Sequence, residues 1–365
     1  MIYEMNNARN DAQVVNGKIT KKSPVVEIFS AWVNGESLDK FGKKGDEAVK
    51  YIKALGAKAE NGDFNAISEL NTIRRFAIET PVMEEIKLLG VFGSYQNVGY
   101  DETIERELYT HSDPDARQQA ASGDVTFPVI TKEVYPVPTF TVSGGYAVDY
   151  RRVSLGDMSK ENEGIAQVKT DILNQAKLAI IKKVYNAIKN ATGVKYWDEF
   201  TGLTKTGIDN LLTKVRRNGR PTVIGDYALL SQFTPWQGYV GSISTKDVIG
   251  ISQKTLDEIA QNGIPSIYNG AVLSEMANPY NEYKLNADGS NFETMLPIGL
   301  GFIVPTGAQS PIATYSRGGL TSFSGNDVHT GKILTRFDLE VGCDVAKGRE
   351  HQIGVFYDSN LGGLE

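Results

Sequence analysis

The sequence predicts a mixed helix-and-strand protein of the α+β class, and three observations support this. The segment 159–190 has apolar residues at helical spacing, the segment 196–273 mixes helical patterns with short apolar runs, and strand-like alternation dominates from residue 295 onward. With 365 residues, 41% of them hydrophobic, the chain can bury a sizeable core in two or three lobes, or in one domain with large excursions.

Charge and cysteine content limit the possible functions. The net charge of −6 and pI near 5.4 give no whole-molecule attraction to nucleic acid or an anionic membrane, so any contact with DNA should be local and weak. The single Cys343 cannot form an internal disulfide, which fits a reducing cytoplasm. We expect neither a signal peptide at Met1–Asn7 nor a membrane-spanning segment.

The first 90 residues are expected to form an arm followed by helices. Residues 1–45 contain few periodic apolar positions and predict an extended N-terminal arm. Residues 46–90 form a helical segment that joins a peripheral domain. The expected helices are 46–59, 63–80 and 82–89, with Asp46 and Asp63 as N-caps and Gly62 as a C-cap.

Residues 91–152 predict a long extended loop in the form of a β-hairpin. Its outward limb, 101–117, has six acidic residues against two arginines and one histidine, so it should be solvated unless a basic partner covers it. The returning limb alternates like a strand, but Pro136 and Pro138 restrict it to a sheet edge or a free hairpin. Because an isolated hairpin is marginal in water, another copy of the chain should hold it in place.

Charged residues of this loop are the candidate inter-subunit contacts. They are Asp101, Glu102, Glu105, Arg106, Glu107, Arg117, Arg151 and Arg152. We expect the four acids to form the ribbon's tip and to face basic residues on a neighbouring copy.

The segment 153–195 contains the longest predicted helix, from Ser159 to Asn190, which would extend about 45 Å. Its apolar stripe should lie against a sheet, with the flank touching a second element. Residues 196–319 predict a compact lobe with a central sheet, and the strands of 320–365 should return to the long helix. The lobe's expected elements are helices at 206–217, 226–233 and 252–262 and strands at 222–225 and 268–273.

The sequence offers no catalytic, cofactor-binding or metal-binding motif, so we do not expect an enzyme. The three histidines are isolated, and Cys343 in "EVGCDV" suits a buried strand position better than a nucleophile. A nucleophile elbow and a Walker loop are absent, and "GLGFIVPTG" from Gly299 lacks the third glycine of a dinucleotide fingerprint.

In this order of elements the chain resembles a tailed-bacteriophage major capsid protein of the Hong Kong 97 type. The resemblance covers the arm, extended loop, spine helix 159–190, axial lobe 196–319 and peripheral sheet. It includes segments such as "TVIGDYALLSQF" and the terminal "HQIGVFYD".

The resemblance implies a structural protein that self-assembles through hexamers and pentamers into an icosahedral shell around phage double-stranded DNA. It would be part of the virion capsid, assembled in the host cell cytoplasm, with portal, scaffolding and decoration proteins as further partners. Some family members crosslink lysine to asparagine, but no lysine occurs between 101 and 123, so noncovalent closure is expected.

Two alternatives remain at this point. An encapsulin nanocompartment shares the architecture that the family implies, but would hold an enzyme cargo. An α/β enzyme with a dispersed site would form a small soluble oligomer, whereas a shell protein would form particles of megadalton mass.

Overall fold

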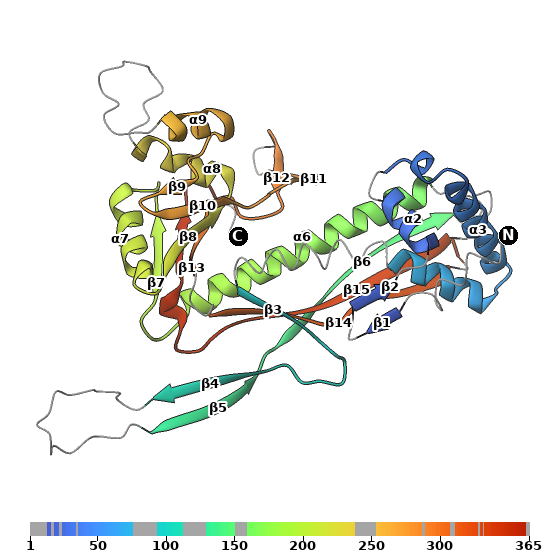
Figure 1. The fold of residues 1–365 in the computed structure, drawn as a ribbon, viewed down its shortest axis with the longest axis horizontal. Coiled ribbons are helices and arrows are strands. Elements are labelled where there is room, and N and C mark those ends of the chain that lie inside the picture. The colour runs from blue at the N-terminus through green and yellow to red at the C-terminus, as the bar shows by residue number, and fades with distance from the viewer. Residues whose placement is uncertain are drawn as a thin grey trace, which may run out of the picture.

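The computed structural model places helices and strands in two lobes joined by one long helix (Figure 1). The structure describes residues 13–15, 18–21, 24–33, 36–75, 93–111, 129–149, 159–237, 253–286, 289–306, 311–327, 329–330 and 332–362. Helix α6 (Ser159–Lys189) runs between the lobes and has the limits that its apolar periodicity predicts. None of the helices within these ranges is long and apolar enough to cross a membrane.

One lobe contains a six-stranded sheet in the order β7-β16-β13-β8-β10-β9. Its strands are β7 (Tyr196–Phe200), β16 (Gly354–Asp358), β13 (Leu300–Thr306), β8 (Arg220–Gly225), β10 (Ala271–Glu275) and β9 (Ile267–Tyr268). Its helices are α7 (Lys205–Arg216), α8 (Tyr227–Leu230) and α9 (Gln253–Asn262). The predicted helices 206–217 and 252–262 are present to within one residue, whereas the predicted helix 226–233 is the four-residue α8 followed by a 3-10 turn, Ser231–Phe233. The predicted strand 268–273 is divided by a turn at Asn269–Gly270. Sequence patterning missed β7.

The last strand differs from the expected division of the chain, which assigned all of 320–365 to the peripheral sheet. Strand β16 instead lies between β7 and β13 in the six-stranded sheet. Four of its five residues are buried, so it suits a central position. Conversely, β14 (Ile312–Asp327) begins inside the predicted lobe 196–319 but belongs to the other sheet.

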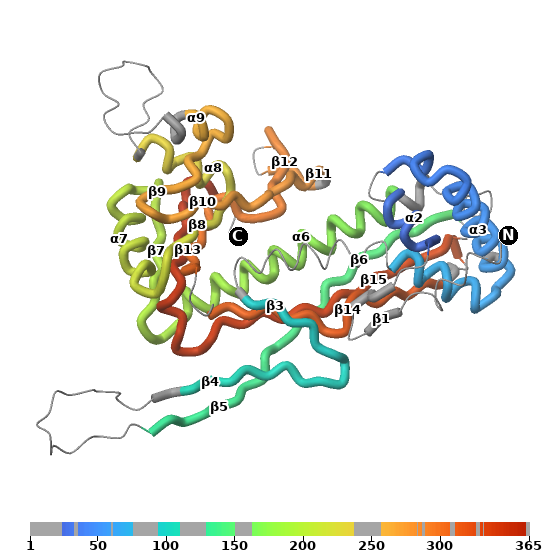
Figure 2. Tube along the Cα trace, in the orientation of Figure 1, coloured from blue at the N-terminus to red at the C-terminus, as the bar shows by residue number. Residues whose placement is uncertain are grey.

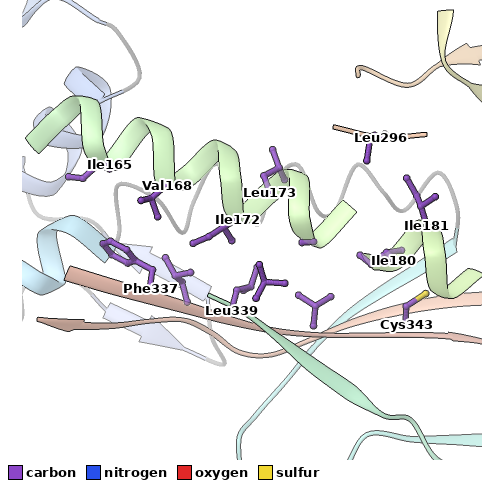
Figure 3. Packing of buried hydrophobic residues seen from close by; sticks show 14 of the residues in the cluster. Ile165, Val168, Ile172, Leu173, Ile180, Ile181, Leu296, Phe337, Leu339 and Cys343 are labelled. Carbon is purple, nitrogen blue, oxygen red and sulfur yellow. The ribbon is translucent and has the colours of Figure 1, made fainter. Parts of the chain in front are cut away.

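The other lobe contains a four-stranded sheet in the order β3-β14-β15-β6, with α6 across one face. The strands beside β14 are β3 (Gly93–Val98), β15 (Lys332–Val345) and β6 (Thr139–Asp149). Figure 3 shows apolar side chains of α6, among them Ile165 and Ile172, facing Phe337 and Leu339 of β15. This contact confirms that the helix buries its stripe on a sheet.

The N-terminal region is more structured than the predicted arm 1–45. After a short hairpin of β1 (Gln13–Val15) and β2 (Lys18–Lys21), helix α2 (Pro24–Val33) begins. Val25, Val26, Ile28 and Phe29 of α2 are buried in the main core. The arm prediction is therefore wrong for 24–33, because these apolar side chains share one helical face behind a favourable first-turn proline.

Two further helices follow α2 and the 3-10 turn η2 (Leu38–Phe41). Helix α3 (Lys43–Glu60) starts three residues before Asp46, whose predicted capping role is therefore wrong; Gly42 occupies that position. Residues 64–75 are helical, and the Asp63 carboxylate accepts a hydrogen bond from the Asn65 N–H at 3.0 Å, as expected of an N-cap. The predicted helix 82–89 lies outside the described residues.

Two hairpins extend from the lobes. Strands β4 (Glu105–His111) and β5 (Ile130–Pro136) form the longer one, which projects from beneath the four-stranded sheet (Figure 2). Strands β11 (Tyr280–Leu285) and β12 (Phe292–Thr294) form the other. The projecting hairpin is shorter than the predicted 91–152, since β3 and β6 at its two ends belong to the four-stranded sheet, with β6 at an edge.

Cys343 is expected to resist thiol reagents in the folded protein. It lies buried on β15, and burial raises the pKa of its thiol to about 12, so almost no reactive thiolate exists at neutral pH. Labelling with a chromogenic disulfide should be slow in buffer and fast in denaturant. Fast labelling in buffer alone would contradict this burial.

Candidate assembly surface

The β4–β5 hairpin exposes apolar side chains that the subunit does not cover. The two strands pair antiparallel from Glu105 opposite Pro136 to His111 opposite Ile130. Tyr109, Val129, Ile130 and Val134 are between 46% and 63% exposed. A two-stranded ribbon is marginal in water, so a surface of this kind favours contact with a second molecule.

Glu107 and Lys132 form an ion pair on one face of the hairpin. The Tyr109 hydroxyl also donates to the Glu107 carboxylate at 2.6 Å. The hydrogen bond from Lys132 lowers the pKa of Glu107, with a smaller contribution from Tyr109. The charge of Glu107, one of the predicted contact residues, is therefore partly neutralised inside its own hairpin.

The base of the hairpin is fixed by Arg106, whose side chain is only 16% exposed. Its guanidinium donates to the Asp344 carboxylate at 3.0 Å, to the Asp344 carbonyl at 3.1 Å and to the Pro311 carbonyl at 2.8 Å. The Tyr135 hydroxyl donates to the same carboxylate at 2.8 Å. Burial and this hydrogen bond raise the pKa of Tyr135 to about 12, so the phenol remains a donor at neutral pH.

A small apolar cluster and one glycine complete the base. The cluster contains Ile104, Val137, Ala313 and Tyr315, contributed by both limbs of the hairpin and by β14. Gly318 lies at an irregularity of β14 with φ of +66°, and a Cβ there would overlap the Tyr100 ring. The close approach of Tyr100 therefore requires glycine at this position.

The predicted contact residues lie differently from what the sequence suggested. Asp101, Glu102 and Glu105 are exposed at the base of the hairpin and not at its tip, because β3 pairs with β14 up to Arg317 before the chain turns into β4. Arg317 also donates to the Glu102 carbonyl at 2.9 Å, which fixes this turn.

Other predicted contacts are used within the chain or fall outside the described ranges. Arg106 makes intramolecular contacts, while Arg117, Arg151 and Arg152 are not described. Sequence reasoning missed Asp344 and Tyr135. Asp344 lies 238 residues from Arg106, and its local pattern gives no sign of the pairing.

Within the described residues no group of three or more His, Cys, Asp or Glu side chains could hold a metal ion. The arrangement of this surface is suited to holding a projecting ribbon in one orientation. Its exposed apolar and charged side chains are of the kind that bind a protein surface.

Comparison with known proteins identifies a family. The family model described as SPbeta prophage-derived putative capsid protein YonB matches residues 4–357. No curated protein matches the sequence.

Several solved structures are similar at low identity. The head structure of Helicobacter pylori bacteriophage KHP40 has a TM-score of 0.48 and 9% identity, covering 73% of this chain and 87% of that one. The structure from Mycobacterium phage Bobi has a TM-score of 0.47 and 11% identity, covering 74% of this chain and 89% of that one. The holo-SrpI encapsulin complex from Synechococcus elongatus has a TM-score of 0.45 and 12% identity, covering 78% of this chain and 89% of that one. All three TM-scores are below 0.5, so the assignment depends on the family match.

Proposed function

Because the chain belongs to the family of the SPbeta prophage-derived putative capsid protein YonB, we propose that it forms a closed icosahedral shell of hexamers and pentamers around phage double-stranded DNA. The family match confirms the prediction of a phage capsid protein, a structural protein that forms a shell. The finer proposal is a Hong Kong 97-type subunit without catalytic activity. The succession of projecting hairpin, long helix and six-stranded lobe supports it.

The observation that carries this proposal is the β4–β5 hairpin, which Arg106 holds at its base and which exposes Tyr109, Val129, Ile130 and Val134. A subunit that presents one surface of this kind and receives its neighbour's on another makes heterologous contacts, which close into rings. Repetition of individually weak contacts then makes a shell durable. Portal, scaffolding and decoration proteins, and assembly in the host cytoplasm, remain part of the proposal.

The test is expression of the full chain, followed by sedimentation and electron microscopy. We expect closed particles of megadalton mass. A stable monomer or small oligomer at high protein concentration would contradict the shell proposal and favour the dispersed-site enzyme.

The contents of the particles separate the phage shell from a cargo compartment. Particles isolated from cells that also carry the neighbouring phage genes should protect DNA from nuclease. Particles that contain a co-purifying enzyme and no protected DNA would favour the encapsulin alternative.

A further inference from the structure

Three exposed arginines lie close together in the chain at one end of the six-stranded sheet. They are Arg216, Arg217 and Arg220, from "KVRRNGR" at the end of α7 and the start of β8. Strand β10 runs parallel to β8, with Val272 opposite Thr222, so the β9–β10 turn lies at the same end. We refer to these three residues as the arginine cluster.

Two of the guanidinium groups are fixed against the β9–β10 turn. Arg216 donates to the Asn269 carbonyl at 3.1 Å, and Arg220 donates to the Gly270 carbonyl at 3.4 Å. A Cβ on Gly270 would lie 3.1 Å from a terminal nitrogen of Arg216, so the glycine allows this guanidinium to lie close to the turn. The Asn269 amide donates to Asp209 of α7 at 2.7 Å, which ties the turn to the helix.

The cluster has no carboxylate partner among the residues that the structure describes. Arg106, Arg317 and Arg336 each pair with an acid of the same chain. Arg216 and Arg220 donate to backbone carbonyls instead, and the hollow of about 440 Å³ beside them is lined by Arg216, Gly219, Arg220 and Gly270. A guanidinium has five N–H donors, so most remain available to an oxyanion.

The acidic residues at the hairpin base have the complementary property. Asp101, Glu102 and Glu105 are exposed, and within the described ranges no ion pair occupies their carboxylates. The Arg317 contact to the Glu102 carbonyl holds the turn without using its side chain. We refer to these three residues as the acidic turn.

We propose that the arginine cluster of one subunit binds the acidic turn of a second copy of the chain. The inference rests on the proposed function, because it names the partner of the hairpin surface in a shell of identical copies. The two surfaces have opposite charge and are held by contacts to backbone carbonyls, and neither has an ion-pair partner among the described residues, so they suit a heterologous contact. Pre-ordered guanidinium groups lose little entropy on binding carboxylates.

A charge-swap experiment on the full chain tests the pairing. Arg216→Glu with Arg220→Glu should reduce particle yield roughly tenfold or more, because like charges then face each other. Asp101→Arg with Glu102→Arg should have a similar effect. Combining the four substitutions restores opposite charges and should recover particles. Particle yield is measured by sedimentation and electron microscopy, and folding of each unassembled variant by circular dichroism.

Two further variants keep the test decisive. Arg217→Glu changes the charge of the arginine cluster and keeps the hydrogen bonds of Arg216 and Arg220 to the β9–β10 turn, so it should weaken assembly even if the double reversal disturbs folding. Lys50→Glu with Lys53→Glu makes a matched charge change on the exposed face of α3 and should leave particle yield unchanged.

Three outcomes would overturn the pairing. One is failure of the four-substitution variant to recover particles while its subunit remains folded. Another is normal particle yield from the Arg217→Glu variant together with that of the Arg216→Glu and Arg220→Glu double variant. The third is intact particles of the arginine variants that retain less nucleic acid, which would assign the cluster to phosphate groups. In each case wild-type particles still form, so the shell proposal stands; if wild type forms none, the shell proposal itself fails.

Discussion

Replacing Arg106 with alanine is expected to loosen the β4–β5 hairpin and reduce particle yield about tenfold or more. The substitution removes three hydrogen bonds. It leaves the Asp344 carboxylate, only 18% exposed, with the Tyr135 hydroxyl as its remaining hydrogen-bond partner among the described residues. Loss of one partner from a mostly buried charged pair costs about 2–4 kcal/mol. Hydrogen exchange of the β4 and β5 amides in unassembled protein measures the effect, and exchange should accelerate there while the six-stranded sheet remains protected.

Two matched variants show whether the effect depends on this geometry. Lys132→Ala removes an ion pair in the same hairpin whose side chains are 47% and 48% exposed, so water already screens the pair and exchange of the β4 and β5 amides should change little. Arg106→Lys keeps the charge, but a lysine cannot reach both carbonyls and the carboxylate at once. The exchange rates of its β4 and β5 amides should therefore lie between those of the wild type and of Arg106→Ala. Wild-type exchange rates in Arg106→Ala would show that the apolar cluster alone fixes the hairpin.

The contact between Arg106 and Asp344 illustrates which part of the surface the sequence could predict. The hairpin itself follows from local information: a charged outward limb, a return strand and prolines that exclude a central position. The location of the acidic residues does not follow from local information. It depends on where β3 stops pairing with β14, which lies more than 200 residues away in the chain. The residue pattern of a strand does not indicate which distant strand it pairs with in parallel.

The helices show the same distinction. The apolar periodicity of helix α6 predicts its start and, to within one residue, its end, because the pattern continues through 31 residues. Helix α2 does not follow from its local pattern, because its ten residues come after a polar stretch. The helix is stabilised by burial of Val25, Val26 and Phe29 in a core assembled from distant segments. Short elements depend on tertiary contacts more than on their own pattern.

The contact between α6 and β15 is the second place where a single substitution should have a large effect. Phe337 is fully buried and stacks on Tyr146 of β6 with ring centroids 6.2 Å apart. It faces the N-terminal half of α6, as Figure 3 shows. Residue Gly144 of β6 lies so close to Ile172 and Val168 of α6 that an added Cβ would contact both at 3.0–3.2 Å. Helix and sheet are therefore closely packed here, with little room for α6 to settle into a cavity.

Phe337→Ala is accordingly expected to lower the free energy of unfolding of the unassembled subunit by about 3–5 kcal/mol, since it removes a buried ring from a site that cannot collapse. Phe323→Ala is the matched control, because Phe323 belongs to the adjacent strand β14 but is 60% exposed; it should cost less than about 0.5 kcal/mol. Denaturant unfolding under conditions that prevent assembly compares the two. Equal losses would mean that the helix–sheet contact is not the main source of stability in this lobe. A large loss for Phe337→Ala alone, with particles that form at low temperature and fail on warming, would show that the long helix stiffens the shell through this contact.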